Sequence, residues 1–135
     1  VFVIASRDRG NSWSEPTRIN NDPIGNGKAQ FFTWMAIDPI DGALNILFFD
    51  RRNSRETETS VQMARSIDGG KTFLNFAVAL DPFECQEDIF FGDYNGVAAY
   101  NGLVIGTFPH FTSAGRLALS AAIFQFSPGT QRLQP

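Results

Sequence analysis

Asp50, Arg51 and Arg52 are the first residues in this sequence whose types and spacing suggest chemistry. A guanidinium group makes paired hydrogen bonds to a carboxylate, so this triplet could hold an acidic ligand such as a carboxylate-bearing sugar. Alternatively, Asp50 pairs with a neighbouring arginine and the triplet has only a structural role. We take Asp50, Arg51 and Arg52 as candidate ligand-binding residues, and the sequence leaves both interpretations open.

Asp93 and Tyr94 form the second candidate group, at the start of an apolar segment that reads as a strand over 93–100. Successive side chains of a strand point to opposite sides, so one of the two should face the middle of the molecule and the other the packing between sheets. Asp93 could then accept hydrogen bonds from hydroxyl groups, and Tyr94 could stack on a sugar ring. Alternatively, Gly92, Asp93 and Tyr94 form a structural turn.

A short motif that occurs twice indicates the turns of the fold that must position these candidates. Both copies have the form S-x-D-x-G-x-S/T-aromatic, and each follows an apolar stretch. The aspartate of such a turn accepts hydrogen bonds from backbone N–H groups a few residues on, and the glycine adopts a positive φ. The first motif comprises Ser6, Asp8, Gly10, Ser12 and Trp13, and the second comprises Ser66, Asp68, Gly70, Thr72 and Phe73. We predict structural hairpin turns and no metal site, because a calcium loop needs a run of alternating acidic ligands.

These motifs resemble the Asp-box, or BNR repeat, of the sialidase (neuraminidase) superfamily, and both copies meet all of its defining positions. Segments 30–38, 49–53 and 91–96 also look like parts of bacterial BNR-repeat proteins. The resemblance covers residues 1–126. It implies a β-propeller whose Asp-boxes lie in turns at the rim, away from any active site.

Strand signals dominate the chain, and no segment shows a helical period. We therefore expect an all-β fold, a β-propeller fragment of about three blades at about 40–45 residues per blade. The expected strand order is CD-ABCD-ABC, with blades at 1–20, 29–81 and 90–126 and a polar, frayed tail at 127–135. The expected strands are 1–6, 13–19, 30–37, 43–50, 60–66, 73–80, 93–100, 103–109 and 116–126. An open, sandwich-like packing of the three sheets is the alternative.

This strand order sorts the connections onto two faces of the fold. The two motifs and the turns at 38–42 and 101–102 should share one face. The loops at 50–59, 81–94 and 108–115 should share the other. The family resemblance implies that this second face is the substrate side, so we expect any function there.

Composition narrows the classes of partner. A net charge of −3 and a pI near 5.0 argue against nucleic acid, which needs a basic surface. No apolar run is long enough for a membrane-spanning helix, and the single cysteine, Cys85, allows no internal disulfide. We expect no cofactor. Because propellers need about four to eight blades, we expect either a homo-oligomer or a missing remainder of the propeller; a start at Val1 without Met also suggests a piece of a longer protein.

Three functional hypotheses follow from these observations. The first is a non-catalytic propeller segment that binds a glycan or a protein partner. The second is a fragment of an exo-sialidase-type glycoside hydrolase, active only if missing blades or other subunits complete it. For that enzyme the resemblance implies three arginines, an Asp acid/base and a Tyr nucleophile, with Asp93 and Tyr94 as candidate catalytic residues. The third is a structural, self-assembling blade module. The resemblance also implies a secreted or periplasmic protein.

Overall fold

The computed structural model of the protein describes residues 1–53, 57–78, 81–86, 88–127 and 129–134, and these residues form an all-β fold. The strands make three antiparallel sheets, none of which closes into a barrel. The strands are β1 (Phe2–Val3), β2 (Thr17–Arg18), β3 (Gln30–Ile37), β4 (Leu44–Asp50), β5 (Glu58–Ser66), β6 (Leu74–Ala77), β7 (Phe83–Glu84), β8 (Gly96–Tyr100), β9 (Leu103–Phe111) and β10 (Leu117–Gln125). Within the described ranges there is no helix of the length and apolar character needed to cross a membrane.

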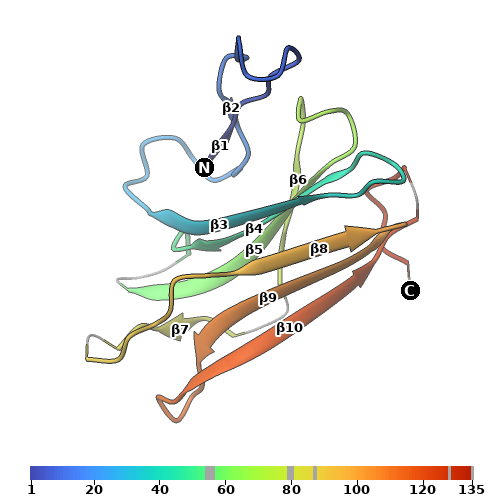
Figure 1. Cartoon of the computed structure of the whole chain (residues 1–135). Helices are drawn as coiled ribbons and strands as arrows, with labels where there is room; N and C mark the ends of the chain where they lie inside the picture. The colour runs from blue at the N-terminus through green and yellow to red at the C-terminus, as the bar shows by residue number, and fades with distance from the viewer. Residues whose placement is uncertain (54–56, 79–80, 87, 128, 135) are drawn as a thin grey trace.

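The sheets are stacked as layers, with the β3–β6 sheet in the middle (Figure 1). The β1–β2 hairpin lies on one side of this central sheet, and the β8–β10 sheet lies on the other. The central sheet has the order β3-β4-β5-β6, and β7 also pairs with β5. The third sheet has the order β8-β9-β10. Each sheet is therefore a run of neighbouring antiparallel strands, as the expected strand order requires.

The apolar run of β4 exists because this strand is covered on both faces. Leu47 and Phe49 point into a core shared with Val104 and Phe108 of the β8–β10 sheet. Phe48 points the other way, into a smaller core beneath the β1–β2 hairpin. Alternate residues of one strand thus join the central sheet to both of its neighbours.

A glycine allows the central sheet and the β8–β10 sheet to approach closely. A Cβ atom on Gly106 of β9 would lie 2.7 Å from Cδ1 of Leu47 and 3.4 Å from Cε of Met63. Real Cβ atoms do not approach another atom so closely, so a larger residue at this position would push the two sheets apart.

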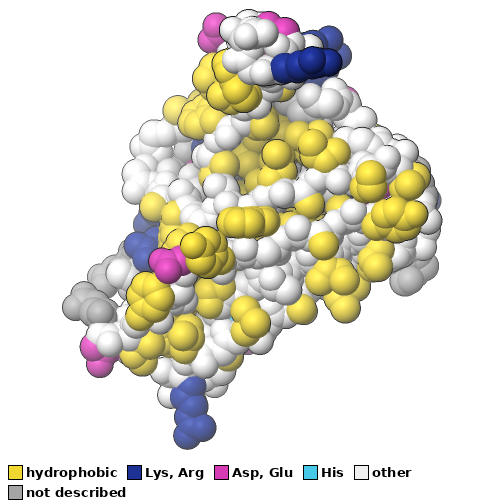
Figure 2. Space-filling view, in the orientation of Figure 1, with side chains coloured by type: hydrophobic (Ala, Val, Ile, Leu, Met, Phe, Trp, Pro, Cys, Tyr) yellow, Lys and Arg dark blue, Asp and Glu magenta, His cyan; other side chains and the backbone are white. Residues whose placement is uncertain are grey.

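The β1–β2 hairpin covers only part of the central sheet. Between it and β3 lies a hollow of about 660 Å³, whose lining includes Ile4, Met35, Ile37 and Leu44. Figure 2 shows the hydrophobic side chains of this region between the hairpin and the body of the molecule. One side of the sheet stack therefore ends in an apolar recess.

Both motifs form the hairpin turns expected from the sequence, with matching hydrogen bonds. In the first, the Ser6 hydroxyl donates to Asp8 (2.8 Å), and the Ser12 backbone N–H and hydroxyl donate to the two Asp8 carboxylate oxygens (2.8 and 2.6 Å). In the second, the bonds to Asp68 from Ser66 and Thr72 have lengths of 2.8, 3.0 and 2.6 Å.

The motif glycines have the positive φ that these turns require, 91° at Gly10 and 84° at Gly70. Trp13 packs back over Gly10, and Phe73 packs over Gly70. The hydroxyls of Ser6 and Ser66 accept the N–H of these glycines at 2.7 and 2.9 Å. The structural role expected for both motifs follows from bonds made within each turn.

The expected strands of the central sheet agree closely with β3, β4 and β5, and those of the third sheet with β9 and β10. The first hairpin is shorter than expected, because β1 and β2 pair over two residues each. The expected strand 73–80 corresponds to β6, and its last two positions, like 54–56 of the expected loop, lie outside the described residues. β7 was not expected from the sequence, because two residues are too few to show a period.

The polar tail is docked and not frayed, which corrects the expectation for 127–135. Leu133 forms a β-bridge with Phe126, and the N–H of Gly129 donates to Asp41 at 2.8 Å. The carbonyl of Thr130 accepts from Arg65 at 3.0 Å. The tail polar groups that the sequence suggested were solvated are used to bind the central sheet; positions 128 and 135 lie outside the described residues.

Candidate ligand site at the loop end of the sheets

The connections gather at two ends of the sheet stack, which we name for the following description. The turn end comprises 38–42, 66–73 and 101–102. The loop end comprises 20–30, 50–53 and the described residues of 81–95. The turn end is held together by Asp38 of one sheet, which accepts hydrogen bonds from the N–H groups of Asn101 and Gly102 in the next (3.0 and 2.8 Å). The candidate ligand-binding residues belong to the loop end.

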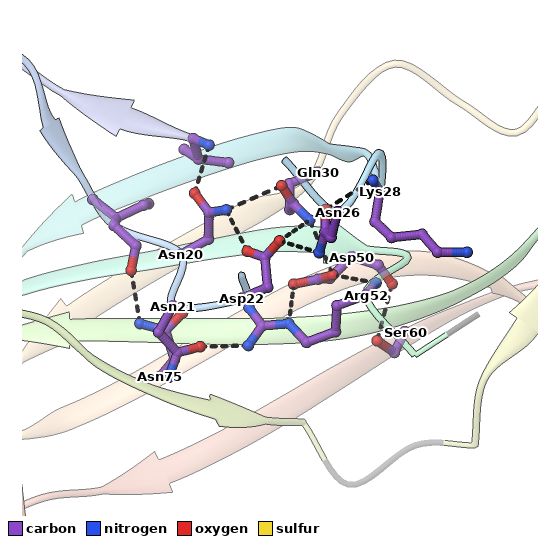
Figure 3. A network of polar contacts seen from close by, with 12 residues as sticks. Asn20, Asn21, Asp22, Asn26, Lys28, Gln30, Asp50, Arg52, Ser60 and Asn75 are labelled. Atoms are coloured by element: carbon purple, nitrogen blue, oxygen red, sulfur yellow. Dashed lines mark hydrogen bonds and ion pairs between the residues drawn. The ribbon is translucent and has the colours of Figure 1, made fainter. Parts of the chain in front are cut away.

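Asp50 is fully buried at the end of β4. Its carboxylate accepts hydrogen bonds from the backbone N–H and from Nε of Arg52, both at 2.6 Å, and from the Gln30 side chain at 3.3 Å (Figure 3). These bonds use both carboxylate oxygens of Asp50 inside the protein. The ion-pair interpretation of Asp50 therefore describes its geometry, and Asp50 does not face a ligand.

Asp22 is the centre of the same polar network, although sequence reasoning assigned 20–28 only to a loop. Its buried carboxylate accepts hydrogen bonds from four side chains, those of Arg18, Asn20, Asn26 and Gln30 (Figure 3). Burial alone would raise the pKa of Asp22, but the hydrogen bonds from Asn20 and Asn26 and the charge of Arg18 lower it overall. The density of Asn and Asp in this loop was the available signal.

Arg52 is tied into this network, whereas Arg51 lies beside it. Arg52 pairs with Asp50 and donates from Nη1 to the Asn21 side chain, and its buried Nη2 has no hydrogen-bond partner among the described residues. Arg51 donates from Nε to Thr59 at 3.2 Å, and its guanidinium carbon lies 5.2 Å from the ring centre of Phe31. Arg51 is half-buried and is the arginine of the triplet without a carboxylate partner among the described residues.

Asp93 and Tyr94 do not begin a strand, which corrects the expectation that one of them faces inward. β8 starts at Gly96, and both residues are exposed in the connection that precedes it. The Tyr94 ring, 73% exposed, meets the 44%-exposed ring of Trp34 edge to face, with the centroids 6.2 Å apart. Sequence reasoning missed Trp34 because it treated 30–37 only as an inner strand.

A β-bulge in β3 connects Arg51 with the Tyr94 region. The register of β3 shifts between Phe31 and Trp34, where Phe32 has a φ of 51°. The Asn95 side chain donates to the Phe32 carbonyl at 2.5 Å, which anchors the Tyr94 connection to the bulge. Phe31, directly before Phe32, lies under the Arg51 guanidinium. Arg51 and the Trp34–Tyr94 pair therefore flank the same short stretch of β3.

A separate hollow of about 410 Å³ lies between the 81–86 and 110–115 connections. Its lining includes Asp81, Glu84 and His110, and Nε2 of His110 lies 2.8 Å from the hydroxyl of Ser120. Nδ1 of His110 lies 3.4 Å from the carbonyl of Phe111, so no carboxylate among the described residues orients the imidazole. This pair lacks the third member of a nucleophile–base–acid arrangement.

The described residues contain no group of three or more His, Cys, Asp or Glu side chains arranged to hold a metal ion. Comparisons with protein-family models, with curated proteins and with solved structures find no match to this chain. The argument for function therefore depends on the arrangement of residues at the loop end.

Proposed function

We propose that this chain is a segment of an Asp-box β-propeller of the sialidase type, and that it binds an anionic glycan at its loop end without cleaving it. The observation that carries the proposal is the exposed, edge-to-face pair of Trp34 and Tyr94, which Asp93 adjoins in the sequence and which shares the β3 bulge with Arg51. The two matching motif turns and the face-to-face stacking of the sheets support the scaffold part of the proposal.

The chemistry of this group suits a sugar acid. Exposed aromatic rings provide an apolar face for the C–H side of a sugar, and an aspartate beside them accepts hydrogen bonds from its hydroxyls. The Arg51 guanidinium supplies the positive charge and paired N–H groups that a carboxylate prefers. Asp50 and Arg52 support the site from below, because they fix the end of β4 to which Arg51 is attached.

Binding without cleavage is the interpretation that the hydrogen bonds favour. A tyrosine nucleophile needs a neighbouring base that activates its hydroxyl. The Tyr94 hydroxyl makes no hydrogen bond to a carboxylate within the described part of the chain, and its neighbour is the Trp34 ring. Asp50, the buried carboxylate nearest in sequence to the arginines, is already occupied by Arg52.

The test is a titration of the protein with a sialylated trisaccharide, followed by calorimetry, together with an assay for released sialic acid. We expect millimolar or tighter binding and no release. Tyr94→Ala and Arg51→Ala should each weaken binding about tenfold, which corresponds to about 1.4 kcal/mol. Tyr100→Ala is the matched control, since Tyr100 is an exposed tyrosine beside the turn end. Absence of binding at 10 mM ligand would overturn the proposal, and sialic acid release would favour the hydrolase hypothesis instead.

A further inference from the structure

We propose that the outer face of the β8–β10 sheet docks onto the same face of a second copy of this chain. We define this outer face by the exposed hydrophobic residues that point away from the central sheet, namely Tyr100, Leu103, Leu117, Leu119 and Ile123. Leu119 is 76% exposed and Ile123 is 67% exposed, although both lie in the middle of a regular nine-residue strand. The proposal is independent of the glycan proposal, because it uses the opposite side of the β8–β10 sheet from the core.

The outer face has the composition of a covered surface. β8, β9 and β10 contain no Asp, Glu, Lys or Arg. In β10 the exposed positions Leu117, Leu119 and Ile123 alternate with the inner positions of the same strand, which pack on the core. A solvated sheet face normally carries polar residues at such positions, and exposed edge strands normally carry charges. The strand therefore has apolar residues on both faces, like strands that are buried between two layers.

The shape of the outer face suits an identical face. Across the strands Ala121 pairs with Thr107, so small side chains lie at the middle of β10, with Leu119 and Ile123 on either side. When two copies meet about a twofold axis near Ala121, Leu119 of one copy faces Ile123 of the other and large side chains fill the space beside small ones. Neither copy brings a charged side chain from these strands, so the contact has no buried, unpaired charge.

The size of the outer face is sufficient for a weak, specific contact. Nine residues at about 3.4 Å each and three strands at about 4.8 Å spacing give a footprint of roughly 400 Å². Apolar patches of about 300–600 Å² are the largest on ordinary monomers and are often functional. A standard interface buries about 800 Å² per partner, so we expect association in the micromolar to millimolar range.

A head-to-tail contact with the hollow beside β3 fits less well. That hollow is recessed between the β1–β2 hairpin and the central sheet, and Arg7 and Lys71 contribute to its lining. A flat, uncharged sheet face would leave space in the recess and would bring apolar residues against the two cations. A symmetric contact needs one surface and closes at two copies, whereas a head-to-tail contact continues into chains.

Sedimentation velocity between 10 and 500 µM tests the proposal. We expect a mass that rises from one copy to two and then stays constant. Leu119→Lys and Ile123→Lys should each keep the protein monomeric at 500 µM, with an unchanged circular dichroism spectrum. Ile24→Lys is the matched control, because Ile24 is 88% exposed in the 20–28 loop and should leave the dimer intact. A monomeric wild type at 500 µM, an unaffected Leu119→Lys dimer, or growth beyond two copies would each overturn the proposal.

Cross-linking provides the second measurement, at the position of the twofold axis. Facing sheets lie about 10 Å apart, which is too far for a disulfide but within reach of a short bismaleimide. Ala121→Cys in a Cys85→Ser background should therefore give a cross-linked dimer, and Ile24→Cys in the same background should not. Equal yields from the two variants would contradict a contact centred on β10.

Discussion

The turn end and the loop end of the sheet stack both contain buried carboxylates and arginines, but they use them differently. At the turn end, charged groups bond from one sheet to another, as Asp38 does with Asn101 and Gly102. At the loop end, the Asp22 and Asp50 networks bond within the 18–30 and 50–52 segments and leave the neighbouring Arg51, Asp93 and Tyr94 accessible or half-accessible. The difference shows that the same residue types hold the sheets together at one end and support a surface for ligands at the other.

Arg65 is the clearest case of the structural use of charge at the turn end. It is fully buried, donates to Asn45 (2.8 Å), Asp41 (3.2 Å) and the Thr130 carbonyl (3.0 Å), and its guanidinium carbon lies 4.3 Å from the ring centre of Phe126. Burial lowers the pKa of Arg65, and the charge of Asp41 partly opposes this effect. A single side chain thus joins the central sheet to the C-terminal tail.

The largest expected effect is that of Arg65→Met. Removing one partner of a buried ion pair costs about 3–5 kcal/mol of unfolding free energy, because the remaining polar groups lose their bonds. Urea denaturation followed by circular dichroism measures this loss. Arg116→Met is the control, since Arg116 is exposed and should change stability by no more than about 0.5 kcal/mol. If Arg65→Met changed glycan affinity without changing stability, the division between the two ends would be wrong.

The next largest effect is expected for Arg52→Ala, and it sharpens the comparison at the loop end. The sequence interpretation expected this change to weaken ligand binding without unfolding the protein. In the structure, Arg52 neutralises the fully buried Asp50, so we expect a loss of about 3 kcal/mol in addition to weaker binding. Arg51→Ala should weaken binding with little loss of stability. Equal unfolding midpoints for the two variants would show that Arg52 is not part of the structural support.

Asp38→Ala should cost about 2 kcal/mol. Burial raises the pKa of Asp38, but hydrogen bonds from the N–H groups of Gly102, Ile40 and Asn101 outweigh burial and lower it. Without the carboxylate, these N–H groups lose their acceptor at the contact between two sheets, and an unsatisfied buried donor costs about 1–3 kcal/mol. Thermal unfolding by calorimetry provides the measurement. An unchanged midpoint would mean that the turns at 38–42 and 101–102 do not hold the sheets together.

The smallest expected effects come from the two motif aspartates. Hydrogen bonds from Ser12 and Ser6 lower the pKa of Asp8 from 3.8 to about 2, and bonds from Thr72 and Ser66 lower that of Asp68 further. Because the folded-state pKa values are depressed, this contribution to stability is present above pH 3.8 and disappears as the pH falls towards 2.

Asp68→Ala should therefore lower the thermal midpoint at pH 7 and flatten the loss of stability in acid. Asp8→Ala should do so less, because Gly70 of the second motif is buried against Leu44 and Val3, whereas Gly10 of the first is exposed at the tip of a short hairpin. A pH series of thermal unfolding curves between 2 and 7 measures both variants. A larger effect for Asp8→Ala would contradict the packing argument.

The sequence predicted the strands and turns well because their signals are local. The alternation in 43–50 and the Asn101-Gly102 turn depend on neighbouring residues, and both are present in the structure. The sequence analysis did not predict the polar contacts between distant segments. Arg65 occupies an inward position of β5, and its partners Asp41 and Thr130 come from other parts of the chain. An arginine at a core position of an apolar strand was the signal for this network.

The candidate site was predicted in part. The triplet 50–52 and the pair 93–94 lie in loop-end connections, and segments linked through β3 join them. The sequence could not distinguish buried Asp50 from half-buried Arg51, because burial depends on Gln30 and the bulge of β3. Trp34 was missed for the same reason, since its exposure follows from the bulge.

The most direct test of the division between the two ends is a titration of ¹⁵N-labelled protein with a sialylated trisaccharide, followed by two-dimensional NMR. We expect saturable shifts of the backbone amides in 29–34, 50–53 and 93–95, with no shifts in 38–42, 66–73 and 101–102. Shifts confined to the turn end, or no saturable shifts at 10 mM ligand, would contradict the assignment of ligand binding to the loop end.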